Sequence, residues 1–286
     1  MDIKLFVCCH QPCGVPNHPL LVPLQVGAAL ADGHFAGFLH DDAGENISDQ
    51  NQSCCELTGQ YWAWKNVEAD YYGFFHYRRY LYPDQTAKRP YRIETGPNLE
   101  RLDKLRFSEL EALIPKYDLI LPKGENMYVP VREHYACAPF HHGEDLELAE
   151  QILLERCPEY LGAADRYLSG TACYFGNIFI MRKQVFFDYC QWLFPVLEEF
   201  DRRRDVSGYG EQERRVDGYL AERLLGVYCA FHREHSALEL PRVHFVPKTV
   251  ERCGKRVTNM VLPPGTHRRA AIKKLWKKRI GQKTYG

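Results

Sequence analysis

A run of twelve residues from Ala69 to Tyr80 constrains the fold of this chain more than any other stretch, and it reads ADYYGFFHYRRY. The apolar and aromatic residues from Tyr71 to Phe75 have the length and β-propensity of a buried strand. The character of the run changes at His76, after which cationic and phenolic side chains dominate. Because open α/β sheets bind ligands at the carboxyl ends of their strands, we predict a central strand that ends at a ligand site.

Two adjacent arginines, Arg78 and Arg79, follow this strand. A guanidinium group is planar and binds two phosphate or carboxylate oxygens at once. Neighbouring cations repel each other unless an anion lies beside them. The pair therefore favours a phosphorylated ligand, with His76 and Tyr77 beside it. The alternative is that both arginines lie on a solvated turn and the aromatic rings only pack.

Composition limits the class of protein. With 286 residues, of which 45% are hydrophobic, the chain has the size of one large α/β domain with an appendage. We find no apolar run of the roughly 18 residues that a membrane-spanning helix needs, and no signal-peptide pattern at the start. The eleven cysteines are odd in number and show no CxxC spacing, which indicates reduced thiols and a cytoplasmic location.

Charge is distributed unevenly along the chain. After Glu251 there are eleven Lys or Arg and no acidic residue, which leaves 37 − 11 = 26 basic and 37 acidic side chains in residues 1–251. The body thus carries −11 and the tail +11, so we expect an anionic partner for the tail. We predict one main α/β domain over 1–265 and a basic amphipathic helix over 266–286, with Trp276 at the headgroup level of an anionic membrane surface. A nucleic-acid partner is disfavoured because the acidic body would repel a polyanion.

Hydrophobic patterning predicts the remaining elements. We expect a first strand over Ile3–Cys9 that ends at His10, then a loop over Gln11–Pro23. Further strands are expected at 118–121 and 176–182, and helices from Asn51 or Ser53 to about Asn66 and at 107–114, 145–156, 183–203 and 217–232. Residues 83–115 are predicted to form a variable, irregular segment whose only regular element is the short helix at 107–114.

A polar turn precedes the first of these helices. Asp41, Asp42, Asn46 and Ser48 lie close together in it and offer oxygen atoms that can hold a ribose, a sugar hydroxyl or a divalent cation. The spacing is not that of an EF-hand.

Three motifs carry a resemblance to a known family. These are DD-x-G-x-N-I-S, C-E-L-T-x-x-Y-W-A-W-K-N and G-x-x-H-Y-R-R-Y. Together they resemble a family of bacterial glycosyltransferases from capsular, exopolysaccharide and O-antigen clusters, long catalogued as a domain of unknown function. The resemblance runs to roughly Lys248. It implies a GT-A-like, Rossmann-like α/β fold with a mixed sheet flanked by helices, and sugar transfer from a nucleotide-sugar donor; some relatives are thought to transfer galactofuranose.

The resemblance also suggests how the donor is held. GT-A enzymes commonly bind the donor diphosphate through a metal ion on a DxD motif, whereas this chain has the HYR sequence at the matching place. We therefore expect Arg78 or Arg79 to neutralise the diphosphate, helped by Lys65. Asp41 and Asp42 keep a divalent cation, Mn²⁺ or Mg²⁺, open as an alternative. Asn177 is a donor contact by analogy, and His10 belongs to the same expected site. No residue is assigned as a metal ligand.

An inverting enzyme needs a carboxylate that deprotonates the acceptor hydroxyl. Glu222, in the family-like string GYLAERL, and Asp217, at the spacing D-x-x-L-x-x-R, are the two candidates. The alternative for each is structural, with Asp217 as a helix cap and Glu222 paired with an arginine.

A second polar cluster is assigned to the acceptor. Its members are His134, Tyr135, His142, Asp145 and Arg223. A zinc site built from His134, His141, His142 and Asp145 is conceivable, but no ligand spacing requires it.

These inferences give one expected function and two alternatives. We expect a peripheral enzyme on the cytoplasmic face of the inner membrane that transfers sugar from a nucleoside-diphosphate donor, a UDP-sugar, to a lipid-linked oligosaccharide. The first alternative is a noncatalytic subunit that binds sugar nucleotides or polysaccharide. The second is a nucleic-acid-binding protein that works through its basic end.

Overall fold

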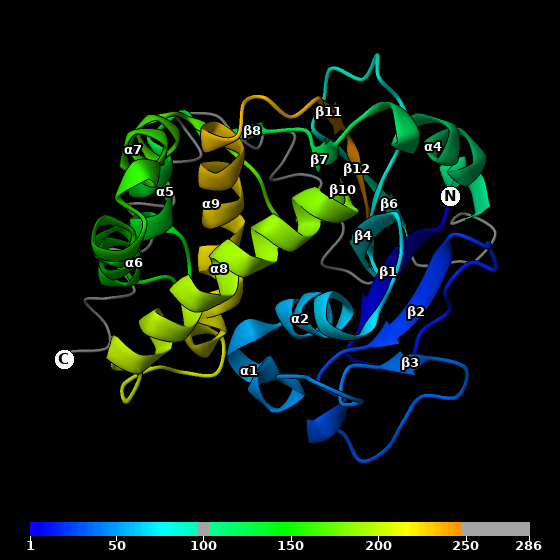
Figure 1. Ribbon diagram of the computed structural model, residues 1–286, viewed down its shortest axis with the longest axis horizontal. Helices are drawn as coiled ribbons and strands as arrows, with labels where there is room; N and C mark the ends of the chain where they lie inside the picture. The colour runs from blue at the N-terminus through cyan, green and yellow to red at the C-terminus, as the bar shows by residue number, and fades with distance from the viewer. Residues whose placement is uncertain (96–102, 247–286) are drawn as a thin grey trace.

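The computed structural model describes residues 1–95 and 103–246, and its centre is a ten-stranded mixed sheet flanked by helices (Figure 1). In sheet order the main strands are β3 (Leu39–His40), β2 (Leu21–Gln25), β1 (Ile3–Cys9), β4 (Tyr71–His76), β10 (Phe179–Arg182), β7 (Leu119–Pro122) and β11 (Ala237–Leu240). A branch joins β5 (Arg79–Leu81) and β6 (Tyr91–Thr95) through β12 (Arg242–Val246). The expected α/β class with a mixed sheet is confirmed.

The predicted central strand is the middle of this sheet. Every residue of β4 is buried, with β1 parallel on one side and β10 antiparallel on the other. At Gly73 the neighbouring strands approach so closely that a Cβ atom would lie 2.4 Å from the Leu5 side chain. Successive residues face opposite sides, so Phe74 joins one hydrophobic cluster and Phe75 the other. The aromatic run thus buries both faces of the sheet.

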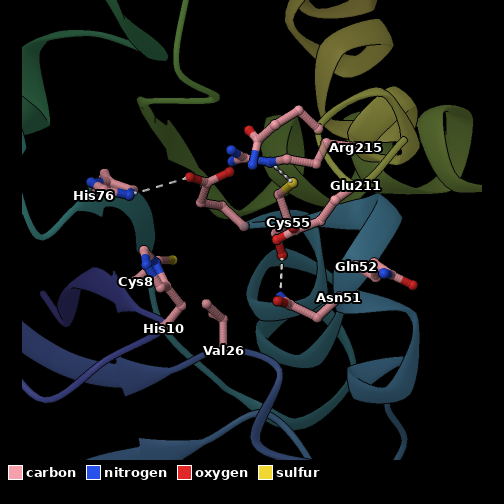
Figure 2. Close-up of a pocket in the computed structure, with 11 residues that line it drawn as sticks. Cys8, His10, Val26, Asn51, Gln52, Cys55, His76, Glu211 and Arg215 are labelled. Atoms are coloured by element: carbon pink, nitrogen blue, oxygen red, sulfur yellow. Dashed lines mark hydrogen bonds and ion pairs between the residues drawn. The ribbon is translucent and has the colours of Figure 1, made fainter. Parts of the chain in front are cut away.

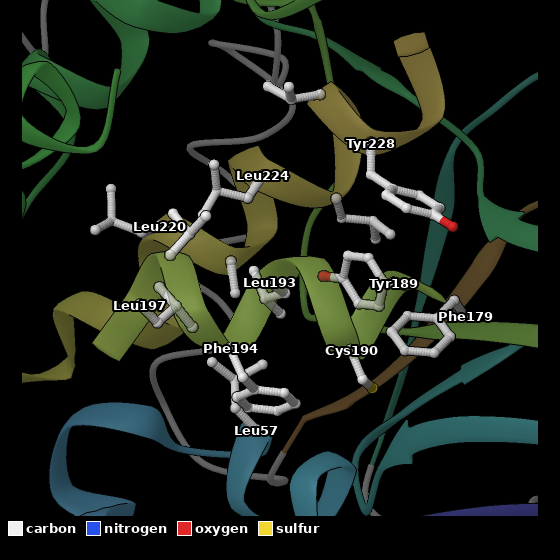
Figure 3. Packing of buried hydrophobic residues seen from close by; sticks show 14 of the residues in the cluster. Leu57, Phe179, Tyr189, Cys190, Leu193, Phe194, Leu197, Leu220, Leu224 and Tyr228 are labelled. Atoms are coloured by element: carbon white, nitrogen blue, oxygen red, sulfur yellow. The ribbon is translucent and has the colours of Figure 1, made fainter. Parts of the chain in front are cut away.

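Helices cover the two faces unequally. They are α1 (Asn51–Cys54), α2 (Leu57–Asn66), α4 (Phe107–Leu113), α5 (Val131–Cys137), α6 (Gly143–Arg156), α7 (Leu161–Ser169), α8 (Lys183–Arg203) and α9 (Val216–Phe231). The long helix α8 lies on the larger cluster, where the Phe186 ring stacks 4.7 Å from Tyr72. Figure 3 shows the same helix packing Leu193 and Tyr189 toward Leu220 and Tyr228 of α9. The face that holds Phe75 is covered by α4.

The predicted helices agree with the structure with one exception, but α5 and α7 were not predicted. The predicted helix 183–203 is α8, and those at 107–114, 145–156 and 217–232 correspond to α4, α6 and α9 within two residues. The single helix predicted up to Asn66 is wrong, because the chain breaks between α1 and α2 at Cys55, whose φ is 52°. A left-handed residue cannot continue a right-handed helix.

Three predictions, for the loop at 11–23, the irregular segment at 83–115 and the strand at 176–182, need correction. The loop expected over Gln11–Pro23 ends earlier, since β2 already begins at Leu21; Pro23 is tolerated because β3 pairs only with the last two residues of β2. Residues 83–115 hold the strand β6 besides the helix, and β6 forms by pairing with the distant β12. The strand expected from Gly176 begins at Phe179, because Gly176 and Asn177 have φ of 94° and 50°.

The basic segment 266–286 lies outside the described residues. Within 1–95 and 103–246, no helix combines the length and the apolar character that crossing a membrane requires.

Candidate functional site

The strand order contains a topological switch between β1 and β4. From β1 the chain adds β2 and then β3 on one side, and it returns to place β4 on the other side of β1, with all these pairs parallel. Open α/β sheets bind ligands in the crevice at such a point, beyond the carboxyl ends of the strands. His10 follows β1 and His76 ends β4, and their ring centres lie 6.1 Å apart. The structure therefore brings these two predicted residues together.

A cavity of about 300 Å³ opens at this switch (Figure 2). Its walls come from the ends of β1, β2 and β4, from the α1–α2 break, and from the segment before α9. The lining residues are Cys8, His10, Val26, Asn51, Gln52, Cys55, Glu56, His76, Glu211, Gln212 and Arg215.

The break between α1 and α2 supplies the carboxylate of the cavity. Cys55, whose φ is 52°, ends α1, and Glu56 follows it just before α2. Its Oε1 lies 3.6 Å from His76 Nε2, and only 14% of its side chain is exposed. The irregular residue that ends α1 thus places a carboxylate at the site.

The electrostatic environment of the histidines is positive. Burial lowers the pKa of His76 to about 2, and Arg79 and Arg78 add to this effect by repelling a proton. Burial also lowers the pKa of His10, although the Glu56 carboxylate acts in the opposite direction. His76 is therefore neutral at pH 7, in a place where neighbouring cations favour an anion.

Arg215 is the cation that lines the cavity itself. Its Nε donates to Cys55 Sγ at 3.2 Å, and burial raises the pKa of the Cys55 thiol to about 12, so this sulfur stays protonated. Among the described residues, Arg215 forms no ion pair within 4.0 Å, and neither do Arg78 and Arg79. Three guanidinium groups at one edge of the sheet are thus available to an anionic ligand.

One face of α9 extends the site. Arg215, Tyr219 and Glu222 follow each other at spacings of four and three residues, which places them on one side of the helix. The Tyr219 hydroxyl donates to the Gln212 carbonyl at 2.9 Å. Glu222 accepts a 2.5 Å bond from the Gly176 amide and a 2.8 Å bond from Arg223, and its side chain is 16% exposed.

The other predicted base lies in a different environment. Asp217 has no exposed surface, and its carboxylate is bound by Arg204 at 3.0 Å and faces the Cys54 thiol at 3.5 Å. Neither Asp217 nor Glu222 lines the cavity. The geometry of Asp217 is that of a buried ion pair at the start of α9.

The predicted polar turn is bound mainly to its own neighbours. Asp41 is fully buried and accepts bonds from the amides of Gly27 and Ala28 and from the hydroxyl of Ser48. Asp42 faces His34 at 2.8 Å, and Asn46 donates to the Asp42 and Gly44 carbonyls. Lys65 pairs with Glu45 at 2.9 Å. None of Asp41, Asp42, Asn46, Ser48 and Lys65 lines the cavity, so the structure does not bring them to the two histidines.

The other predicted donor residues do not line the cavity, although Arg78 and Arg79 lie near enough to His76 to lower its pKa. The Tyr77 hydroxyl accepts from Gln11 at 3.2 Å, and the Arg78 guanidinium lies 4.8 Å above the Tyr77 ring. Arg79 begins β5 and pairs with His76. Asn177 is buried, and its amide donates to the Gly218 carbonyl at 3.0 Å, which joins the start of β10 to α9.

The predicted acceptor residues form two groups. His142 stacks 4.2 Å from the Tyr209 ring, whose hydroxyl donates to Asp145 at 2.8 Å. Arg223 is buried and lies over the rings of Tyr135 and Phe175 at 5.4 Å and 5.0 Å. The His134 ring contacts Phe175 as well, at 5.8 Å. Only the second group contacts the candidate base Glu222, through the Arg223 guanidinium.

Sequence reasoning missed Arg215 and Cys55 and did not assign Glu56. Glu56 belongs to the CELT motif, so the motif itself was a usable signal. Arg215 could have been found from helical periodicity, since it lies seven residues before Glu222. No local pattern indicates the left-handed Cys55.

Two groups of described residues could ligate a metal ion. His34, His40 and Asp42 bring their ligand atoms within 4.8 Å, and so do His232, Glu234 and His235. Their nitrogen and oxygen donors would suit a divalent ion. Neither group lines the cavity between β1 and β4.

Comparisons with known proteins agree with this fold. Residues 4–234 match the family model described as Domain of unknown function (DUF4422). The apo structure of the bifunctional glycosyltransferase WbbM is similar, with a TM-score of 0.80 and 31% identity over 86% of this chain. This chain spans 45% of the length of WbbM. None of the curated proteins matches it. The chain has an α/β fold shared with a glycosyltransferase, and it belongs to the DUF4422 family.

Proposed function

We propose that this protein is a glycosyltransferase that transfers a sugar from a nucleoside-diphosphate donor to a glycan acceptor during surface polysaccharide synthesis. The observation that carries the proposal is the cavity at the β1–β4 switch, in which a neutral His76 lies among unpaired arginines. Ligand binding at this point is expected of open α/β sheets, and the similar WbbM is a glycosyltransferase.

Arginine side chains would hold the leaving group. Arg215 lines the cavity, while Arg78 and Arg79 lower the pKa of His76 through their positive charge. A departing nucleoside diphosphate develops negative charge that such preorganised cations stabilise. Because none of the three has an ion-pair partner among the described residues, none has to be released before the donor binds. His10 and Glu56 would orient the donor from the opposite walls.

Glu222 is the base we propose for the acceptor. In an inverting transfer, its carboxylate takes the proton of the acceptor hydroxyl, whose oxygen then bonds to the anomeric carbon. The bond from that carbon to the diphosphate oxygen breaks, and the diphosphate leaves with the electron pair. Glu222 shares a helix face with Arg215 and is partly exposed, whereas Asp217 is fully buried and bound to Arg204. This difference in access favours Glu222.

The resemblance of the motifs supports a more specific proposal for the donor and the acceptor. We propose a UDP-sugar, with galactofuranose as the first sugar to test, and a lipid-linked oligosaccharide at the cytoplasmic membrane face. The basic segment 266–286 would hold the enzyme to anionic lipid, at about 1 kcal/mol for each Lys or Arg near the surface.

Release of nucleoside diphosphate tests the proposal. The full chain is incubated with a panel of nucleotide sugars without acceptor, and free UDP is measured. A glycosyltransferase hydrolyses its donor slowly under these conditions, and Glu56→Gln and Arg215→Ala should reduce that release. A noncatalytic subunit would bind a nucleotide sugar but release no UDP, and this outcome would refute the enzyme.

A further inference from the structure

A second and larger hollow lies beside β6 and β12. It has a volume of about 820 Å³ and runs between the β6–β12 pair and the segment around β8 (Glu125–Asn126). We call it the β6–β8 groove and define it by Tyr82, Lys88, Arg89, Tyr91, Tyr128 and Arg242. None of the motifs singled out in the sequence falls in it.

The floor of the groove is formed by the buried Arg242. Arg242 and His244 point to the same side of β12, and Arg79 of β5 pairs opposite His244. Arg242 is only 2% exposed; it pairs with Glu125 and donates to the Phe175 carbonyl at 2.6 Å. Its Nε has no hydrogen-bond partner, although the atom is buried. A buried guanidinium with an unused donor favours a further acceptor group nearby.

The walls add further cations and aromatic rings. Lys88, Arg89, Arg92 and Arg242 line the groove against Asp84 and Glu125, a net charge of 4 − 2 = +2. Tyr91 stacks on His244 with ring centres 5.1 Å apart, and Tyr128 is 43% exposed. Such rings offer flat apolar faces with a polar hydroxyl at the edge, which suits the C–H faces and hydroxyls of a sugar ring.

The groove adjoins the proposed catalytic carboxylate through one short segment. The Gly176 amide donates to Glu222, and the neighbouring Phe175 carbonyl accepts from Arg242. A Cβ atom on Gly176 would lie 3.7 Å from Arg242 Nη1. The β5 strand makes a second link, since Arg79 pairs with His76 on one side and with His244 on the other. Through the Phe175–Gly176 segment, the groove residue Arg242 and the proposed base Glu222 are therefore two hydrogen bonds apart.

We propose that the β6–β8 groove binds an anionic stretch of the acceptor glycan, one that carries carboxylate or phosphate groups. The inference rests on the proposed function, because it takes the cavity at the β1–β4 switch as the donor site. Cations select the acidic groups, and the tyrosine rings hold the sugar faces.

Titration calorimetry on the full chain tests this assignment. The probes are tetragalacturonate as an acidic glycan, maltotetraose as a neutral one, and inorganic phosphate. We expect tetragalacturonate to bind and maltotetraose to bind at least roughly tenfold more weakly, a difference of about 1.4 kcal/mol. Phosphate alone should compete only at much higher concentration, because it lacks the sugar faces.

Variants locate the binding. Lys88→Ala/Arg89→Ala removes two exposed cations for which the described residues show no ion pair, and the affinity for tetragalacturonate should fall roughly tenfold. Tyr128→Asn removes a ring at φ 59°, a conformation that Asn tolerates, and should weaken binding similarly. Lys4→Ala/Lys116→Ala is the control for the loss of charge. It also removes two positive charges, near the amino-terminal ends of β1 and β7, of which Lys4 pairs with Asp2, and its affinity should stay unchanged.

Several results would overturn the assignment. They are absence of tetragalacturonate binding, equal affinity for maltotetraose, equal affinity in the groove and control variants, or preferential binding of a single-stranded oligothymidylate to the groove. UDP titration of the wild-type chain reports separately on the donor cavity. A failure of the groove assignment is therefore distinguishable from a failure of the proposed function.

Discussion

His76 and Glu56 face each other across the β1–β4 switch, with 3.6 Å between Nε2 and Oε1. The first ends the central strand and the second follows the break between two short helices. Burial and the nearby arginines hold His76 neutral, so the contact is not a strong ion pair at pH 7. The carboxylate and the arginines both remain available to a ligand, and the predictions below depend on this arrangement.

Arg215→Ala should weaken UDP binding roughly tenfold or more, because a charge-assisted bond to phosphate contributes about 1.5–3 kcal/mol. Titration calorimetry with UDP measures the loss. Arg214→Ala is the control, since Arg214 is exposed and does not line the cavity. Equal affinities in the two variants would show that the diphosphate lies elsewhere.

Arg78→Ala should abolish most of the thermal stabilisation that a bound UDP-sugar gives the wild-type chain. A ligand stabilises the native state in proportion to the logarithm of its concentration over Kd, so a weakened site gives a smaller shift in Tm. Thermal-shift measurements with a saturating donor decide the matter. An unchanged shift would contradict the role of this arginine in neutralising phosphate.

Glu222→Gln and Asp217→Asn should differ in their effect on turnover. A glutamine at position 222 can still accept from the Gly176 amide but cannot take up a proton, so kcat should fall by roughly 10²–10⁴-fold. It also removes the charge paired with the buried Arg223, so the free energy of unfolding should fall as well. Asp217→Asn removes one of the two carboxylates that bind Arg204, the other being Asp201, and should lower the free energy of unfolding by about 1–3 kcal/mol. Urea unfolding and turnover are measured on both variants. If Asp217→Asn folds normally and loses turnover, Asp217 is the base instead.

Acid should destabilise the protein through His76. Its pKa is about 2 in the folded chain and 6.5 ordinarily, so between these values the unfolded chain binds a proton that the native state does not. Stability from this residue is complete above pH 6.5 and falls as the pH drops, by up to about 1.4 kcal/mol per pH unit. Urea unfolding across this range should show a smaller pH slope for His76→Gln. Equal slopes would mean that His76 is protonated in the fold.

Chelation should leave UDP binding in place. The cavity is lined by Arg215 and two histidines, and neither of the two possible metal-ligand groups of the described residues lies in it. Thermal shifts with UDP are compared with and without EDTA. A shift that EDTA removes and Mn²⁺ restores would assign the phosphate charge to a metal ion, and His34→Ala would then test the group with Asp42.

The sequence alone predicted the helices and strands that form because of local hydrophobic patterns. The buried strand at Tyr71–His76 and the long helix at Lys183–Arg203 follow from hydrophobic runs and helical periodicity within a few turns of chain. The position of His10 and His76 at one edge was also predictable, because parallel strands end on the same side. The expected α/β class follows from these same patterns.

Only the tertiary structure decided which polar side chains meet at that edge. The sequence predicts Asp41 as a ligand residue, yet its carboxylate accepts hydrogen bonds from the backbone amides of Gly27 and Ala28, which lie on another part of the chain. Arg215 reads as one charge among many, yet the packing of α9 leaves it without an ion-pair partner in the described part of the chain. Whether a charged side chain is already paired within the protein or can bind a ligand depends on residues that are far away in sequence. A local sequence pattern does not show which of these residues pack together.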